Sequence, residues 1–148
     1  MSGVPPGDPG FIWSVRIYYE DTDAGGVVYH SNYLKFMERA RTEWLRALGF
    51  EQDVLARQEG VLFAVRSLTV DYRSPARFND CLDVVCWLVE QGGASLVFHQ
   101  EVRPEREGKC LCSARVKVAC LDAGTLRPRP IPKLILEQIH PKLTKEDE

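Results

Sequence analysis

One amphipathic helix pattern, about residues 32 to 48, is the longest regular segment of the sequence and leaves few folds to choose from. Apolar side chains recur at helical spacing at Tyr33, Phe36, Met37, Ala40, Trp44, Ala47 and Leu48. Ser31 or Asn32 is placed to cap the start, and Gly49 to end it. A stripe this apolar needs a sheet against it, which predicts a two-layer α+β domain.

Strand patterns lie on both sides of this helix. One precedes it in "FIWSVRIYYE" (11–20), which places Val15, Ile17 and Tyr19 on one face. Four follow it, at 61–73, 81–91, 94–103 and 109–122. The connections between these four are short, which predicts that consecutive strands pair antiparallel. Shorter helix patterns occupy 51–59 and 132–139.

Length and composition predict one domain. The chain has 148 residues, of which 45% are hydrophobic and 27% charged, enough for one core. We expect a disordered arm at 1–10, a single domain at 11–140 and a charged tail at 141–148. A net charge of −2 with interspersed signs does not favour nucleic-acid binding. No run has the length of a membrane span, and no signal pattern is present at the start.

The chain has five cysteines, an odd number without a secretion signal, which predicts a reduced, cytoplasmic protein. Cys110, Cys112 and Cys120 fall on alternate positions of one strand pattern. They are therefore predicted on its buried face, where free cysteine behaves as a small apolar residue. Cys81 and Cys86 lack the spacing of a metal site and are also assigned to the core.

The loop "EDTDAGGVVYH" (20–30) places two aspartates, two glycines and a histidine directly before the long helix. A helix N-terminus offers free N–H groups and a positive dipole end, which stabilise a developing oxyanion. The glycines let backbone amides approach a ligand. A carboxylate beside such a site can act as nucleophile or base, and His30 can donate a hydrogen bond or move a proton. These groups suit the hydrolysis of an activated acyl group.

Plainer interpretations of the same residues exist. Asp21 and Asp23 are also good turn formers, and His30 could be a surface residue beside a helix. A metal site built from these three side chains would be short of ligands, so we predict neither a metal nor a cofactor. His99 and His140 lack a partner motif and are taken as structural.

The segment "VRIYYEDTDAGGVVYHSNYLKFMERARTEWLRALGF" (15–50) resembles the signature of the hot-dog-fold acyl-CoA thioesterases of the 4-hydroxybenzoyl-CoA thioesterase type. It is most similar to their Tol–Pal-associated branch (the YbgC type). The resemblance extends from about Ile12 to Ile139. It implies a five-stranded antiparallel sheet wrapped around one long helix. It also implies association of subunits into dimers or a homotetramer, and hydrolysis of a short- or medium-chain or aromatic acyl-CoA.

The resemblance also implies roles for individual residues. Asp23 falls on the family's catalytic carboxylate, and His30 on a position whose backbone N–H polarises the thioester carbonyl. Asp21 would support the loop. Glu38 is a weaker candidate, because another hot-dog branch uses a carboxylate on the helix. The expected substrate-binding residues are Gly26, Val28, Tyr29, Arg66 and Arg73, with Arg77 as a further basic candidate for the CoA moiety.

Two other functions fit the same pattern. A hot-dog domain can bind acyl-carrier protein or a lipid-synthesis enzyme with little turnover of its own. A dehydratase of this fold, acting on β-hydroxyacyl thioesters, would also use a histidine and an acid, although the spacing here does not support it. Turnover of an acyl-CoA panel separates these functions from the thioesterase.

Overall fold

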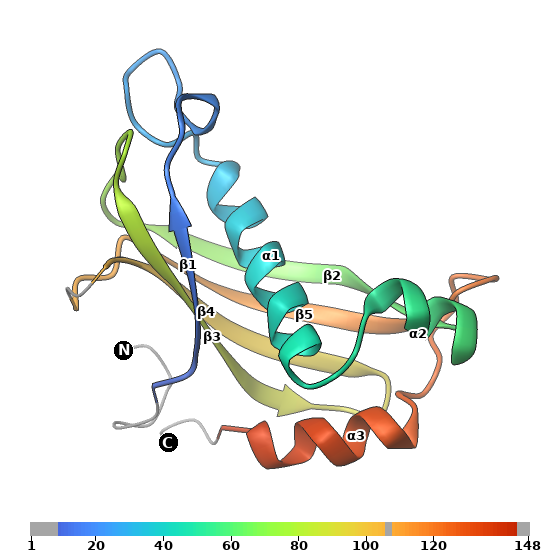
Figure 1. Cartoon of the computed structure of the whole chain (residues 1–148). Coiled ribbons are helices and arrows are strands. Elements are labelled where there is room, and N and C mark those ends of the chain that lie inside the picture. The colour runs from blue at the N-terminus through green and yellow to red at the C-terminus, as the bar shows by residue number, and fades with distance from the viewer. Residues whose placement is uncertain (1–8, 106–107, 145–148) are drawn as a thin grey trace.

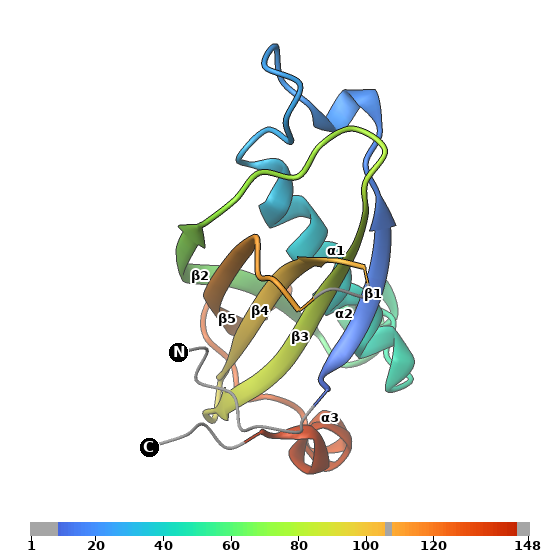
Figure 2. The same ribbon diagram turned by 90° about the vertical axis from the view of Figure 1, so that its left-hand side faces the viewer.

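The computed structural model describes residues 9–105 and 108–144, so most of the predicted arm and half of the predicted tail lie outside the described residues. A five-stranded antiparallel sheet curves around the long helix α1 (Asn32–Ala47), as Figures 1 and 2 show. The strands are β1 (Phe11–Arg16), β2 (Val61–Tyr72), β3 (Cys81–Gln91), β4 (Ser95–Pro104) and β5 (Cys112–Asp122). Short helices α2 (Gln52–Gln58) and α3 (Lys133–Ile139) complete the fold. The predicted α+β hot-dog architecture is confirmed.

The strand order is β1-β3-β4-β5-β2. The predicted hairpins between β3 and β4 and between β4 and β5 are confirmed. Pairing of β2 with β3 was predicted and is wrong, because β2 pairs with β5 and β3 pairs with β1. The connection 73–80 instead crosses from one edge of the sheet towards the other, above the start of α1 (Figure 2). A short connection does not by itself require a hairpin.

Strand β1 is shorter than its sequence pattern. Ile17 is buried, but the chain then enters the short 3-10 turn η1 (Tyr19–Asp21). Tyr19, predicted on the strand face of Val15 and Ile17, lies outside the strand: its side chain is 75% exposed and stacks on Phe78 with ring centroids 3.9 Å apart. The physical reason is local, since the carboxylate of Asp21 accepts a hydrogen bond from the Tyr18 N–H at 2.9 Å and turns the chain.

The buried stripe of α1 differs from the predicted one by the addition of Asn32 at the start and by its last turn. Its buried members are Asn32, Tyr33, Phe36, Met37, Ala40, Trp44 and Leu45. Ala47 was predicted on this stripe but is exposed, and Leu48 is half-buried. Leu45 takes their place because Gly49, with a φ of +99°, ends the helix and directs the buried Phe50 back to the core.

One polar contact crosses the apolar interface between α1 and the sheet. Gln100 on β4 is fully buried, and its Nε2 donates to the Met37 carbonyl oxygen at 2.9 Å. Its Oε1 accepts a hydrogen bond from Arg41 Nη1, also at 2.9 Å. Both ends of the amide are therefore satisfied by the helix, as a buried amide requires.

The five cysteines are free thiols, but not all lie in the core. Cys86, Cys112 and Cys120 are buried, and desolvation raises the pKa of Cys86 and of Cys112 to about 12. Cys81 and Cys110 were predicted to be buried and are partly exposed. Cys110 precedes β5, and Cys81 is the first residue of β3, so both lie at an end of the sheet.

His99 has a partner that its sequence context did not reveal. Its Nε2 lies 2.9 Å from Glu101 Oε2, on the same face of β4. Arg103 Nη2 lies 2.8 Å from the other oxygen of Glu101, and the Trp87 ring lies beside His99. These contacts fit the structural role predicted for His99. No helix in the described part of the chain is long and apolar enough to cross a membrane.

Candidate active site

The loop between β1 and α1 is a compact turn rather than an open excursion. Asp23 donates its N–H to the Val27 carbonyl oxygen at 2.9 Å, and Gly26 donates to the Asp23 carbonyl oxygen at 3.0 Å. A bridge between Thr22 and Val28 closes its base. Gly26 has a φ of +80°, a conformation that side chains other than glycine rarely adopt. The second glycine therefore fixes the turn that presents Asp23.

Asp21 holds the two ends of this loop together. It is buried, and its Oδ1 accepts a hydrogen bond from Asn32 Nδ2 at 2.9 Å, while Oδ2 accepts from the Tyr18 N–H. Its carbonyl oxygen also accepts from the Tyr29 N–H. The predicted side-chain cap of α1 is absent, since Ser31 makes no capping hydrogen bond and the Asn32 amide is directed to Asp21. The carboxylate of Asp21 is thus committed to the loop.

The crossing connection 73–80 supports the loop from the other side. Val28 donates its N–H to the Ala76 carbonyl oxygen at 2.8 Å, and the Ala76 N–H donates to Tyr33 Oη at 3.0 Å. Tyr72, at the end of β2, donates its hydroxyl to the His30 carbonyl oxygen at 3.0 Å. Burial raises the pKa of both tyrosines, which keeps them protonated at neutral pH.

Asp23 and His30 line the same cavity, of about 350 Å³. The full lining is Asp23, Val27, Val28, His30, Tyr33, Tyr72, Arg73, Ser74 and Pro75. Asp23 Oδ1 accepts a hydrogen bond from the Gly25 N–H at 2.8 Å. Its other oxygen has no hydrogen-bond donor among residues 9–105 and 108–144. The Asp23 carboxylate is therefore oriented by one oxygen and available through the other.

The backbone N–H of His30 is the second available group. Two nearby amides are occupied, because the Tyr29 N–H donates to the Asp21 carbonyl oxygen and the Asn32 N–H donates to the Tyr29 carbonyl oxygen. No acceptor in the described part of the chain pairs with the His30 N–H. It lies just before the first turn of α1, where the helix dipole favours negative charge. A free carboxylate oxygen and a free amide donor thus border one cavity.

Four of the predicted site residues do not line this cavity with a free functional group. Gly26 shapes the turn, and Tyr29 is exposed beside the His30 ring without lining the cavity. Arg73 lines the cavity, but its guanidinium pairs with Asp71 at 2.8 Å. Arg66 is exposed and lies about 20 Å along β2 from the cavity residue Tyr72.

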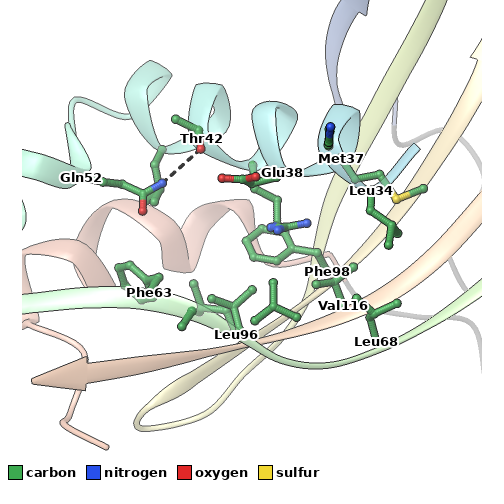
Figure 3. Close-up of a pocket in the computed structure, with 16 residues that line it drawn as sticks. Leu34, Met37, Glu38, Thr42, Gln52, Phe63, Leu68, Leu96, Phe98 and Val116 are labelled. Carbon is green, nitrogen blue, oxygen red and sulfur yellow. Dashed lines mark hydrogen bonds between the residues drawn. The ribbon is translucent and has the colours of Figure 1, made fainter. Parts of the chain in front are cut away.

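The remaining candidates are placed elsewhere. The Arg77 backbone bridges Val27, and its N–H donates to Asp80 Oδ2, so it supports the loop. Glu38 lines a larger cavity of about 400 Å³ between α1 and the sheet, drawn in Figure 3. Within the described ranges, no group of three or more His, Cys, Asp or Glu side chains is placed to hold a metal ion.

Five residues of the cavity were not among the predicted site residues: Val27, Tyr33, Tyr72, Ser74 and Pro75. Tyr33 was assigned to the buried helix stripe, and its hydroxyl was the only sign of a polar role. Tyr72 and the two residues after it depend on the crossing of 73–80 above the helix. The hairpin prediction kept this connection at one edge of the sheet, away from the helix N-terminus.

Comparison with known proteins adds to this geometry. A model of the thioesterase-like superfamily matches residues 17–139. The acyl-CoA thioesterase YbgC of Haemophilus influenzae is 46% identical over 133 residues, which cover 90% of this chain and 96% of that protein. A crystal structure from Bartonella henselae, described as a probable thioesterase, is 33% identical and has a TM-score of 0.77, covering 82% of this chain and 98% of that one.

A more distant structure has the same fold. Slr0204 from Synechocystis, a 1,4-dihydroxy-2-naphthoyl-CoA thioesterase, is 20% identical with a TM-score of 0.81. It covers 88% of this chain and 95% of its own. At this identity the likeness extends to the fold alone.

Proposed function

This chain belongs to the thioesterase-like superfamily and is an acyl-CoA thioesterase, and from this premise we propose how it cleaves its substrate. The reaction is hydrolysis of the acyl-CoA thioester to a free acid and CoA. We assign short- or medium-chain or aromatic acyl groups as substrates. A thioester is already activated, so an oriented carboxylate and a dipole aimed at its carbonyl oxygen are sufficient to cleave it.

In this proposal the thioester lies in the 350 Å³ cavity with its carbonyl oxygen at the His30 N–H. The N-terminus of α1 adds to the stabilisation of the oxyanion. The free oxygen of Asp23 either attacks the carbonyl carbon or removes a proton from the attacking water. In the first route Asp23 forms a mixed anhydride as the C–S bond breaks, and water then hydrolyses the anhydride to release the acid and restore Asp23. In the second route water attacks the acyl carbon directly and the C–S bond breaks as the tetrahedral intermediate collapses. The proton is returned to the CoA sulfur, with the exposed His30 imidazole placed to carry it.

The main support for this proposal is that one cavity is lined by two residues, Asp23 and His30, that each have a polar group available to a substrate. The second oxygen of Asp23 and the N–H of His30 have no hydrogen-bond partners within the described residues. Removal of one oxyanion-hole donor typically costs about 2.7–4 kcal/mol of transition-state stabilisation.

The test is release of CoA thiol from a panel of acyl-CoA esters, measured with a thiol reagent in the presence and absence of EDTA. We expect turnover in both conditions, because carboxylate and amide complete the chemistry without a metal. Loss of activity in EDTA with recovery on adding zinc would contradict the mechanism. Tight binding of acyl-CoA or acyl-carrier protein without any thiol release would instead favour the binding-module function.

We also propose that the enzyme is a homodimer or a tetramer. Strand β2 is at the edge of the sheet, where it presents unpaired backbone groups and the exposed apolar residues Val65, Leu68 and Tyr72. A second copy pairing along this edge would cover them and place the Tyr72 cavity at the subunit boundary.

Static light scattering at micromolar concentration is expected to give a mass of two or four chains. The variant Leu68→Lys adds charge to the exposed edge and is expected to shift the population towards smaller species. The mass is the readout, because Leu68 also lines the cavity beside α1. A monomeric wild-type enzyme with full activity would rule out the boundary site.

A further inference from the structure

The larger cavity continues the active site along α1. Counting down the helix from His30 in steps of three or four residues gives Leu34, Glu38, Arg41 and Leu45, all of which line the 400 Å³ cavity. On the opposite side, β2 contributes Tyr72 to the smaller cavity and Leu68 to the larger one. An acyl group whose thioester meets Asp23 therefore has this space directly beyond it.

The walls of the larger cavity suit an acyl group. Figure 3 shows apolar side chains from β2, β4 and β5 facing α1 across the space, among them Phe63, Leu68, Leu96, Phe98 and Val116. Polar groups are few. Gln52 of α2 donates a hydrogen bond to Thr42 Oγ1 at 3.2 Å at one end (dashed line in Figure 3), so these two side chains largely satisfy each other.

Arg41 is different, because it is a cation that lines the cavity and forms no ion pair within the described residues, although the charge of Glu38, three residues earlier on α1, acts on it. It is half-buried, and burial lowers its pKa below the ordinary value for arginine. Its side chain makes one hydrogen bond within the described residues, to the neutral amide of Gln100, and no carboxylate there lies within ion-pair distance. A guanidinium carries five N–H donors, so most of them are not used by the protein.

The unused donors face accessible space. In the described part of the chain, no fully buried side-chain nitrogen or oxygen lacks a partner, so the remaining Arg41 donors are not sealed in the core. A hydrocarbon chain that reached Arg41 would displace water from these donors without supplying a hydrogen-bond acceptor, which is unfavourable. An acyl group with an oxygen acceptor at that depth would replace the water.

We propose that the larger cavity receives the acyl group and that Arg41 selects acyl groups that end in a carboxylate. Arg41 lies about 10 Å further along the helix axis than Leu34, which sets the depth at which the acceptor is needed. Lys35 lines the same cavity but is exposed, so water screens its charge. The charge of Glu38 acts on Arg41 and raises its pKa, but burial has the larger effect. Arg41 is therefore the partly buried cation that meets the end of the chain. This inference rests on the thioesterase function proposed above.

The experiment compares length-matched pairs of substrates: glutaryl- with pentanoyl-CoA, adipoyl- with hexanoyl-CoA, and suberoyl- with octanoyl-CoA. At the best length, kcat/KM of the wild-type enzyme is expected to be about 10–100-fold higher for the carboxyl-ended member, as for a charge-assisted, bidentate contact. The hydroxyl-ended analogue of the same length should fall between the two. A methyl-ended chain that reacts equally well at every length would overturn the proposal.

Variants separate recognition from structural support. Arg41→Met keeps the stem but removes the charge, and is expected to abolish or invert the preference within each pair. Lys35→Met removes a cation from the exposed rim of the same cavity and is the matched control, with the preference retained. A variant that slows both members of every pair equally would identify Arg41 as a support for Gln100 alone, against the proposal.

Two measurements distinguish a failure of the role proposed for Arg41 from a failure of the thioesterase function on which it rests. Absence of thiol release from all substrates would contradict the thioesterase function, whereas turnover without a carboxylate preference contradicts only the role of Arg41. Calorimetric binding of adipoyl- and hexanoyl-CoA to the Asp23→Asn variant gives a second measure that does not need turnover. Tighter binding of the adipoyl ester is expected, and equal affinity counts against selection by Arg41.

Discussion

Replacing Asp23 by asparagine is expected to lower kcat by about 10²–10⁴-fold while KM changes little. Asparagine keeps the shape and the acceptor that Gly25 uses, but its amide cannot attack the carbonyl carbon or deprotonate water. The loop itself should survive, because Asp23 is exposed and its turn is held by backbone hydrogen bonds. Steady-state kinetics, after circular dichroism confirms folding, measures the effect.

Two neighbouring variants serve as controls. Asp21→Asn should reduce kcat less and stability more, because that carboxylate is buried and accepts from Tyr18 and Asn32. His30→Ala should give an intermediate loss, since the backbone N–H remains when the imidazole is removed. An Asp23→Asn enzyme within a few-fold of wild type would remove Asp23 from the chemistry and direct attention to Glu38.

Glu101→Gln is expected to lower the free energy of unfolding by about 2 kcal/mol at pH 7. The carboxylate lies between His99 and Arg103, at 2.9 and 2.8 Å, and is nearly inaccessible to water. The hydrogen bond from His99, followed by that from Arg103, lowers the pKa of Glu101 from about 4.5 to about 2. Glutamine keeps the volume but leaves Arg103 without its anion.

The effect has a definite pH window. Because the pKa of Glu101 is depressed in the folded state, its stabilisation is fully present above about pH 4.5 and is lost as the pH falls towards 2. Urea unfolding of both proteins at pH 7, 5 and 3 and one fixed chain concentration measures the difference. A gap that stays constant from pH 7 to pH 3 would show that packing, rather than the ionised carboxylate, accounts for the loss.

Local pattern was sufficient to predict most elements. The spacing of hydrophobic residues predicted α1 and all four strands after it. Each element buries one face, so its hydrophobic residues recur with the period of a helix or a strand. Strand order was not predictable in the same way. Whether the chain turns back after β2 or crosses to the far edge is decided by pairing with β5 and β1, which are distant in sequence.

The same distinction between local and long-range contacts applies to the candidate site. Asp21, Asp23 and His30 lie in one contiguous loop, so their proximity followed from the sequence. Tyr72 and Ser74 reach the cavity only through the crossing connection, and they were missed. Arg66, a candidate for binding the CoA moiety, stays a prediction: it is exposed and lies far along β2 from the cavity.

The buried amide of Gln100 has a consequence for how the two layers are aligned. Apolar surfaces alone permit a helix to slide or rotate over a sheet at little cost, because many registers bury similar area. A single amide that bonds the Met37 carbonyl oxygen and Arg41 at once is satisfied in only one of those registers. Gln100 therefore fixes the position of α1 relative to β4. It keeps the loop at the head of α1 and the cavity beside it at a fixed spacing.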